Sequence, residues 1–308
     1  MDMVSKKNLE KISIIIPIYN EEGSIEKLYN KIKKEMTVVP NDYEIIYIDD
    51  GSTDNSFTIL EKLNSIDSKV KIIKFRQNFG QTPAFSAGIE YSSGEIIITM
   101  DGDLQNDPAD ISRMLGKLNE GYDVVSGWRE KRQDDLITRK IPSKIANSLL
   151  SWATGTKLHD YGCSLKVYRA SVLKPLHLYS EMHRFIPAFS AFIGGKVTEM
   201  KVNHLPRIYG TSKYGISRIW KVLIDLLKIQ LLVKFSRHSL VWFFSVGSVF
   251  LLLGLIFGIS TIFGEQGISE NEFYIVYLGS SILYLELFAF FASLGILGEL
   301  ITRFQDKE

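Results

Sequence analysis

Short runs of β-branched and other apolar residues alternate with polar or helical stretches from residue 12 to about residue 205. Four of these runs, Ile12–Ile18, Glu44–Ile48, Val70–Phe75 and Glu95–Met100, have the length and composition of buried strands. A helical pattern over Ser24–Glu35 follows the first run, and plausible helices separate the others. Alternation of strands with helices predicts an α/β domain built on a mostly parallel sheet.

Two much longer apolar runs, Leu240–Phe263 and Tyr274–Leu297, occupy the C-terminal part. Each exceeds the roughly 20 apolar residues that a helix needs to cross a bilayer, so the two runs predict a transmembrane hairpin. The alternative is a pair of buried helices in a soluble protein. That alternative is disfavoured because the short tail offers nothing to cover their apolar circumference. Glu286 lies inside the second run, where an ionised carboxylate is costly, and the sequence leaves its role open.

The charges beside these runs predict an orientation. The connector at 264–273 contains acids but no Lys or Arg, whereas Lys and Arg residues precede the first run and follow the second. Positive charge marks the cytoplasmic side, so we expect both termini and the α/β domain in the cytoplasm. Residues 216–238 place basic residues among Ile, Leu and Trp, which favours an interfacial amphipathic helix over a helix packed on the soluble core. The predicted organisation is a catalytic domain at 1–215, a juxtamembrane segment at 216–238, and an anchor and tail at 239–308.

The amino-acid composition excludes some classes of function. The 36 Lys and Arg residues balance 35 Asp and Glu residues, which gives no support for nucleic-acid binding. The single cysteine, Cys163, rules out an internal disulfide, and the five histidines lack zinc-site spacing. No apolar stretch of signal-peptide type follows the charged N-terminus, so we expect membrane targeting to come from the C-terminal runs.

Acidic clusters follow two of the predicted strands, at Asp49–Ser52 and Asp101–Asp103. Ligands of parallel sheets bind beyond the carboxyl ends of the strands, so both clusters are expected at one edge. Asp101 and Asp103, with an amide oxygen from Gln105, supply the hard oxygen ligands that Mg²⁺ or Mn²⁺ prefers. A surface turn is the alternative for an isolated Asp-Gly-Asp. The second acidic cluster favours a metal and nucleotide site instead.

The order of these motifs resembles family 2 glycosyltransferases. The resemblance is carried by Pro17-Ile-Tyr-Asn-Glu21, Asp49-Asp-Gly-Ser-Thr-Asp54, Asn78-Phe-Gly80 and Asp101-Gly-Asp-Leu-Gln105. More closely, the chain is similar to bacterial polyprenyl-phosphate glycosyltransferases and dolichyl-phosphate mannose synthases, from about Ile12 through both spans. The resemblance implies a GT-A fold.

The resemblance also implies roles for individual residues. The residues that it places against the nucleotide are Pro17, Tyr19, Glu21, Asp50 and Asp101. Asp101, Asp103 and Gln105 are placed against the metal and the donor diphosphate, and Asp103 is also assigned a catalytic role. The residues that it places near the acceptor phosphate are Arg129, Arg139, Ser143, Arg207, Ser212 and Lys213. Asp160 occupies the place of an acceptor-side acid that orients the acceptor or accepts a proton, and a structural or helix-capping role is an equal alternative.

We therefore expect inverting transfer of a sugar to undecaprenyl or another polyprenyl phosphate at the cytoplasmic membrane face, for cell-envelope glycosylation. UDP-glucose is the leading donor by resemblance, and UDP-N-acetylglucosamine is an alternative. A processive polysaccharide synthase is disfavoured because the chain lacks further transmembrane runs and a Gln-x-x-Arg-Trp segment. A non-catalytic membrane sensor of nucleotide sugars is disfavoured because both acidic motifs are present. The sequence leaves open the donor sugar, the polyprenyl length, the choice between Mg²⁺ and Mn²⁺, and whether the chain forms a homo-oligomer.

Overall fold

The computed structural model describes residues 10–130, 151, 156–176, 178, 182–206, 218–263 and 270–305. Packing divides the chain into two units, Met1–Asp225 and Leu226–Glu308. The first unit holds a seven-stranded sheet in the order β3-β2-β1-β4-β6-β5-β7. The strands are β1 (Ile12–Ile18), β2 (Tyr43–Asp49), β3 (Val70–Lys74), β4 (Ile96–Thr99), β5 (Val124–Trp128), β6 (Lys166–Arg169) and β7 (Val197–Lys201).

The sheet is parallel except at one strand. β1 pairs in parallel with β2 and β4, and β5 pairs in parallel with β7. β6 runs antiparallel between β4 and β5. The four strands expected from the apolar runs are all present, so the predicted α/β fold with a mostly parallel sheet is confirmed.

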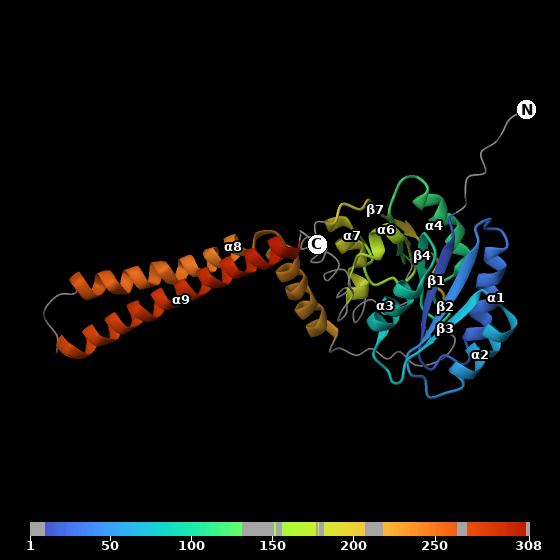
Figure 1. The fold of residues 1–308 in the computed structure, drawn as a ribbon, viewed down its shortest axis with the longest axis horizontal. Helices are drawn as coiled ribbons and strands as arrows, with labels where there is room; N and C mark the ends of the chain where they lie inside the picture. Colours follow the sequence, from blue (N-terminus) through green and yellow to red (C-terminus); the bar gives the residue numbers. More distant parts are fainter. Residues whose placement is uncertain are drawn as a thin grey trace, which may run out of the picture. The chain divides into compact units, whose positions relative to one another are not determined.

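Helices cover both faces of the sheet (Figure 1). The longer helices of this unit are α1 (Ile25–Met36), α2 (Ser56–Ile66), α3 (Gln81–Tyr91), α4 (Ile111–Leu118) and α7 (Ile186–Phe192). The shorter ones are η1 (Pro108–Asp110), α6 (Ala170–Leu173) and η3 (Met182–Arg184). Side chains alternate along β1, so Ile14 and Ile16 pack with α1, α2 and α4, whereas Ile15 packs with α3 and α7. Burial on both faces explains why the central strands read as continuous apolar runs.

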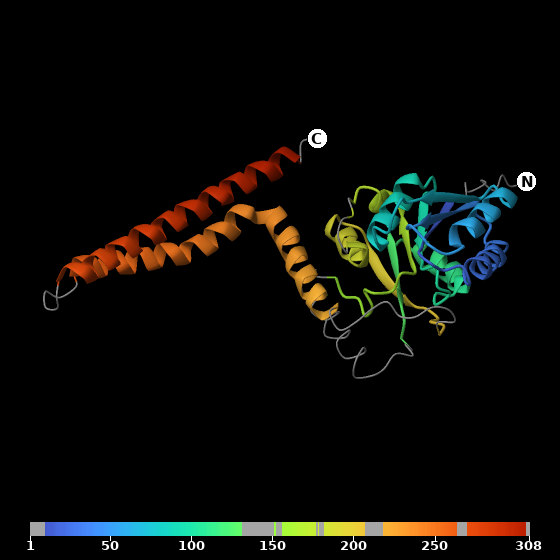
Figure 2. The same cartoon turned by 90° about the horizontal axis from the view of Figure 1, so that it is seen from below.

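The second unit contains most of α8 (Arg218–Phe263) and all of α9 (Glu270–Gln305). The C-terminal part of α8 lies beside α9 and forms a helical hairpin with it in both views (Figures 1 and 2). Ser239–Phe263 and Tyr274–Ile301 are long and apolar enough to cross a membrane. Glycines allow the two helices to approach closely: a Cβ at Gly254 would lie 3.1 Å from Leu285 Cγ, and one at Gly247 would lie 3.2 Å from Phe288 Cδ2. The Ser281 hydroxyl donates to the Gly254 carbonyl oxygen at 2.9 Å, which satisfies a polar group inside the hairpin.

Candidate active site

The site begins where three neighbouring parallel strands end. Ile18 of β1 is in register with Asp49 of β2, and Ile15 of β1 is in register with Thr99 of β4. The loops that follow β1, β2 and β4 therefore leave the sheet at the same edge. These loops carry the acidic clusters predicted to converge there.

The loops after β1 and β2 are held together by hydrogen bonds. Asn20, in the left-handed region at φ 54°, donates its backbone N–H to Ser52 Oγ at 3.0 Å. Thr53 N donates back to Asn20 Oδ1 at 2.8 Å, and Glu21 N donates to Ser56 Oγ at 2.9 Å. These bonds fix half-buried Tyr19 and Glu21 at the sheet edge.

Asp50 fastens the loop before α3 to the same edge. One carboxylate oxygen accepts from Phe79 N at 2.7 Å and the other from Gly80 N at 2.9 Å. Burial raises the pKa of Asp50, and the two backbone hydrogen bonds oppose that rise. The next residue must be glycine, because Gly51 has φ +70° and a Cβ there would lie 2.5 Å from the Gln77 carbonyl carbon.

The Asp101–Gln105 loop lies against the end of β1. A Cβ at Gly102 would lie 2.4 Å from Ile18 Cδ1 and 3.2 Å from the Pro17 carbonyl oxygen, so a larger residue would have to displace the Ile18 side chain. Asp101 N donates to Asn106 Oδ1 at 3.0 Å, and Gln105 N donates to Asp103 Oδ1 at 3.1 Å. Gln81, the first residue of α3, donates its side-chain amide to Asp101 Oδ1. Asp50 and Gln81 thus link the β2, β3 and β4 loops into one framework.

The electrostatics around Asp101 suit a divalent cation. Burial and the neighbouring Asp103 raise the pKa of Asp101 to about 6, whereas Arg129 and Lys166 lower it. Two neighbouring carboxylates, one half-buried and one buried, are the hard oxygen donors that Mg²⁺ or Mn²⁺ takes, and a bound cation would relieve their repulsion. Within the described ranges no group of three or more His, Cys, Asp or Glu side chains is placed to hold a metal ion by itself. A cation held by Asp101 and Asp103 would therefore complete its ligand set with amide, water or substrate oxygens.

A buried ion pair lies beside the acidic loop. Arg129, which follows β5, donates Nε to Asp160 Oδ2 at 2.7 Å and Nη2 to Asp160 Oδ1 at 3.0 Å. Gly162 N donates to Asp160 Oδ1 at 3.0 Å, so both carboxylate oxygens hold partners. Asp160 is placed to orient the Arg129 guanidinium.

Lys166 is a second buried cation near the acidic loop. It is 2% exposed, and its Nζ donates to the Tyr161 carbonyl oxygen at 3.3 Å. Burial lowers the pKa of Lys166 to about 8, while the negative charges of Asp160 and Asp101 oppose that change. Lys166 and Arg129 together offset part of the negative charge of the three aspartates.

The structure brings together the described part of the predicted site. The residues that lie at or next to this sheet edge are Pro17, Tyr19, Glu21, Asp50, Asp101, Asp103, Gln105, Arg129 and Asp160. The other predicted residues, Arg139, Ser143, Arg207, Ser212 and Lys213, lie outside the described residues. Sequence reasoning missed Gln81 and Lys166. Gln81 directly follows the Asn78-Phe-Gly80 motif, which was a usable signal, whereas Lys166 sits in a strand and has no such signal.

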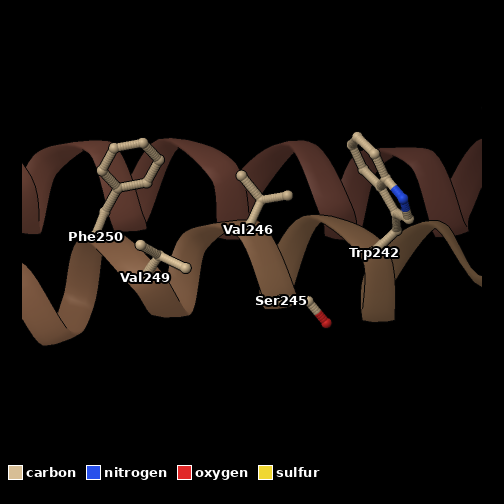
Figure 3. A pocket seen from close by; sticks show the side chains of 5 residues that line it. All are labelled: Trp242, Ser245, Val246, Val249 and Phe250. Atoms are coloured by element: carbon tan, nitrogen blue, oxygen red, sulfur yellow. The ribbon is translucent and has the colours of Figure 1, made fainter.

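A shallow groove on α8 of the hairpin offers no comparable chemistry. It is lined by Trp242, Ser245, Val246, Val249 and Phe250 (Figure 3). The lining carries no charged side chain, so this groove does not suit a nucleotide diphosphate. The polar loops at the sheet edge are the better candidate site.

Comparison with known proteins identifies the family. The model of Glycosyl transferase family 2 matches residues 13–176. A dodecaprenyl-phosphate galacturonate synthase of Rhizobium johnstonii is 44% identical over 77% of this chain and 71% of its own length. An undecaprenyl-phosphate 4-deoxy-4-formamido-L-arabinose transferase of Proteus mirabilis is 35% identical over 98% of this chain and 91% of its own. The chain therefore belongs to glycosyl transferase family 2, among the polyprenyl-phosphate glycosyltransferases, and is an enzyme of that class.

Solved structures agree on the fold. Glucosyl-3-phosphoglycerate synthase from Mycobacterium tuberculosis, in complex with Mn²⁺, UDP and glucosyl-3-phosphoglycerate, aligns with a TM-score of 0.55. The alignment covers 73% of this chain and 80% of that protein, at 17% identity. At that identity the likeness establishes the GT-A fold alone, and it confirms the predicted fold class.

Proposed function

We propose that this enzyme transfers a sugar from a UDP-sugar to undecaprenyl phosphate or a similar polyprenyl phosphate, at the cytoplasmic face of the membrane. The observation that carries the proposal is that the Arg129–Asp160 pair lies close enough to the Asp101–Gln105 loop for Arg129 to lower the pKa of Asp101. One side gathers carboxylates for a cation and a diphosphate, and the other presents a guanidinium suited to a phosphate. The names of the relatives support the acceptor class, because both act on polyprenyl phosphates.

The donor half of the site is assigned to the loops after β1, β2 and β4. Tyr19, Glu21 and Asp50 form the nucleotide side with Pro17, and Asp101, Asp103 and Gln105 form the diphosphate side. A divalent cation bound there would supply electrostatic stabilisation of the charge that develops on the leaving UDP. The Asp101 carboxylate accepts from the Gln81 side-chain amide, and the Asp103 carboxylate accepts from the Gln105 backbone N–H, which holds both in place for this role.

The acceptor half is assigned to Arg129 and to the predicted phosphate contacts outside the described residues. A phosphate monoester is already partly ionised near neutrality, since its second pKa is about 6, and it needs positioning more than deprotonation. A phosphate oxygen attacks the anomeric carbon, the bond from that carbon to the UDP oxygen breaks, and UDP leaves. One direct displacement inverts the anomeric configuration and forms no covalent sugar–enzyme intermediate.

The identity of the donor sugar is the most specific part of the proposal. UDP-glucose remains the donor implied by the family resemblance. The two relatives named above favour testing a uronic acid and a formamido-arabinose donor beside it, because those enzymes are named for these sugars. A panel of UDP-glucose, UDP-N-acetylglucosamine, UDP-galacturonate and a UDP-linked formamido-arabinose, each with undecaprenyl phosphate, separates these cases. Turnover of UDP-glucose above the others is expected, and turnover of another donor alone would replace that assignment.

The two apolar helices form the membrane anchor in this proposal, with both termini in the cytoplasm and the connector on the other side. Membrane anchoring suits an acceptor whose hydrocarbon tail stays in the bilayer. Impermeant labelling of single introduced cysteines at each terminus and at residue 266 tests the arrangement. Labelling of both termini from the cytoplasmic side and of residue 266 from the opposite side is expected. Cytoplasmic labelling of all three positions would reject the hairpin.

A further inference from the structure

The outer face of α9 carries a carboxylate in the middle of the span. Glu286 stands 12 residues after Tyr274 and 15 before Ile301, which are the ends of the apolar segment. At about 1.5 Å per residue, it lies about 18 Å from one end and about 22 Å from the other. An acid at that depth is costly unless protein or a proton satisfies it.

Glu286 faces away from α8. The side of α9 that meets α8 includes Ser281, Phe288 and Gly295, which contact Gly254, Gly247 and Phe243. Glu286 stands two positions before Phe288, about 200° around the helix, and its side chain is exposed. No hydrogen bond or ion pair joins Glu286 to any side chain within the described spans. The hairpin alone therefore leaves this carboxyl facing hydrocarbon.

The residues around Glu286 form a seam suited to close helix packing. We call this the outer seam; its members are Gly279, Ile282, Glu286, Ala289, Ser293 and Ile296. They recur at spacings of three and four, and all are exposed in the single chain. Alternating three- and four-residue spacing is the pattern of a helix–helix interface, and the small residues in it let two backbones approach in a membrane. At Gly279 the space that a Cβ would occupy is open.

The chemistry of Glu286 favours a second copy of the chain as the partner that packs on the outer seam. Ser239–Phe263 and Tyr274–Ile301 contain no Lys, Arg or His, so neither span offers a cation to the carboxylate. A protonated carboxyl both donates and accepts a hydrogen bond. A twofold axis places a central seam residue opposite its own copy, so two such carboxyls satisfy each other without any cation.

We propose that the outer seam of α9 is the contact between two copies of this enzyme in the membrane, with the Glu286 carboxyls hydrogen-bonded across the axis. The inference rests on the proposed membrane insertion of the hairpin. It does not depend on which sugar is transferred. It assigns to Glu286 a role in association, which the sequence alone leaves open.

The test uses the full chain in lipid vesicles, with the buried Cys163 replaced by serine. Ser293→Cys places a thiol on the outer seam, and Val249→Cys places one on an outward, 55% exposed position of α8 as a matched control. Oxidation is expected to link Ser293→Cys chains into dimers and to leave Val249→Cys chains mostly single. Resistance to carbonate extraction is measured on the same vesicles, so failed insertion is distinguished from failed association.

Glu286 itself is then varied in the Ser293→Cys chain. Glu286→Leu removes both hydrogen-bonding oxygens and is expected to lower the cross-linked fraction at least threefold as the protein is diluted with lipid. Glu286→Gln still donates and accepts, so it is expected to retain at least half of that fraction. The proposal would be overturned if the hairpin inserts but the cross-linked fraction is the same with and without Glu286→Leu. It would also be overturned if the Ser293→Cys chains stay single or link only to a different membrane protein.

Discussion

Arg129 and Asp160 form a two-bond ion pair in which the guanidinium Nε and Nη2 meet both carboxylate oxygens, at 2.7 and 3.0 Å. The arginine is 13% exposed and the aspartate 5%, so the pair is shielded from water. Such geometry fixes the plane of the guanidinium. In our account Asp160 orients Arg129 toward the acceptor phosphate, and it is not the proton acceptor.

Replacing Asp160 separates these two roles. Asp160→Asn is expected to raise the KM for undecaprenyl phosphate about tenfold, because the guanidinium loses its charged partner. The KM for the UDP-sugar should change little. A general base would instead lose about 10²- to 10⁴-fold in kcat with an unchanged acceptor KM. Steady-state kinetics with both substrates distinguish the orienting role from the general-base role. Thermal unfolding must first establish that the variant folds, because breaking a buried ion pair destabilises the folded protein.

Asp103 tests the proposed cation site. Asp103→Asn removes one anionic ligand and should lower kcat at least about a hundredfold, because charge on the leaving diphosphate is then less well stabilised. Mn²⁺ binding measured by calorimetry in the presence of UDP should weaken in parallel, and chelation of the native enzyme should reproduce the loss. A folded variant with native activity and native Mn²⁺ affinity would remove Asp103 from the ligand set.

Gln81 links α3 to the acidic loop and gives a milder prediction. Gln81→Ala deletes the amide that donates to Asp101, so we expect kcat to fall about five- to tenfold through misplacement of one carboxylate. Gln77→Ala, an exposed glutamine four residues earlier, is the matched control and should stay within twofold of the native enzyme. Equal kinetics for the two variants would mean that the Gln81 contact does not position Asp101.

Glu44 predicts a pH dependence of stability away from the site. Burial alone would raise the pKa of Glu44, but hydrogen bonds from Lys71, Ser13 and Ser93 lower it from 4.5 to about 2. A carboxyl with a depressed pKa stabilises the fold above its unfolded value, and that contribution disappears as the pH falls from about 4.5 toward 2. The Tm difference between native protein and Glu44→Gln should therefore be largest above pH 4.5 and shrink below it.

Glu26→Gln is the control for that series. Glu26 pairs with Lys62 at 3.7 Å on the surface, where both side chains are more than half exposed. Exposed pairs contribute little, so its Tm should follow that of the native protein at every pH. A Glu44→Gln difference that stays constant down to pH 2 would contradict the assigned origin of the effect.

The sequence predicted the strands of the donor half well for a physical reason. β1, β2 and β4 are buried on both faces, so their apolar runs are nearly unbroken and end where the polar loops begin. The position of the acidic residues at the strand ends can therefore be read directly from the sequence. Their convergence follows from the parallel pairing of neighbouring strands.

The acceptor half was less accessible to sequence reasoning. β6 enters the sheet antiparallel between β4 and β5, and that placement depends on contacts between segments far apart in the chain. Arg129 and Asp160 are 31 residues apart in the sequence, so no local sequence pattern predicts that they pair. Lys166 reads as a polar position of a strand, and only the fold reveals that it is buried beside two aspartates.

The most direct test of the proposed activity is mass spectrometry of undecaprenyl phosphate after incubation with the purified enzyme, a divalent cation and each UDP-sugar of the panel. Our account predicts one new lipid whose mass gains a single sugar residue, and the disappearance of that lipid with Asp103→Asn. Release of sugar to water, growth of a longer glycan, or UDP-sugar binding without any modified lipid would contradict it.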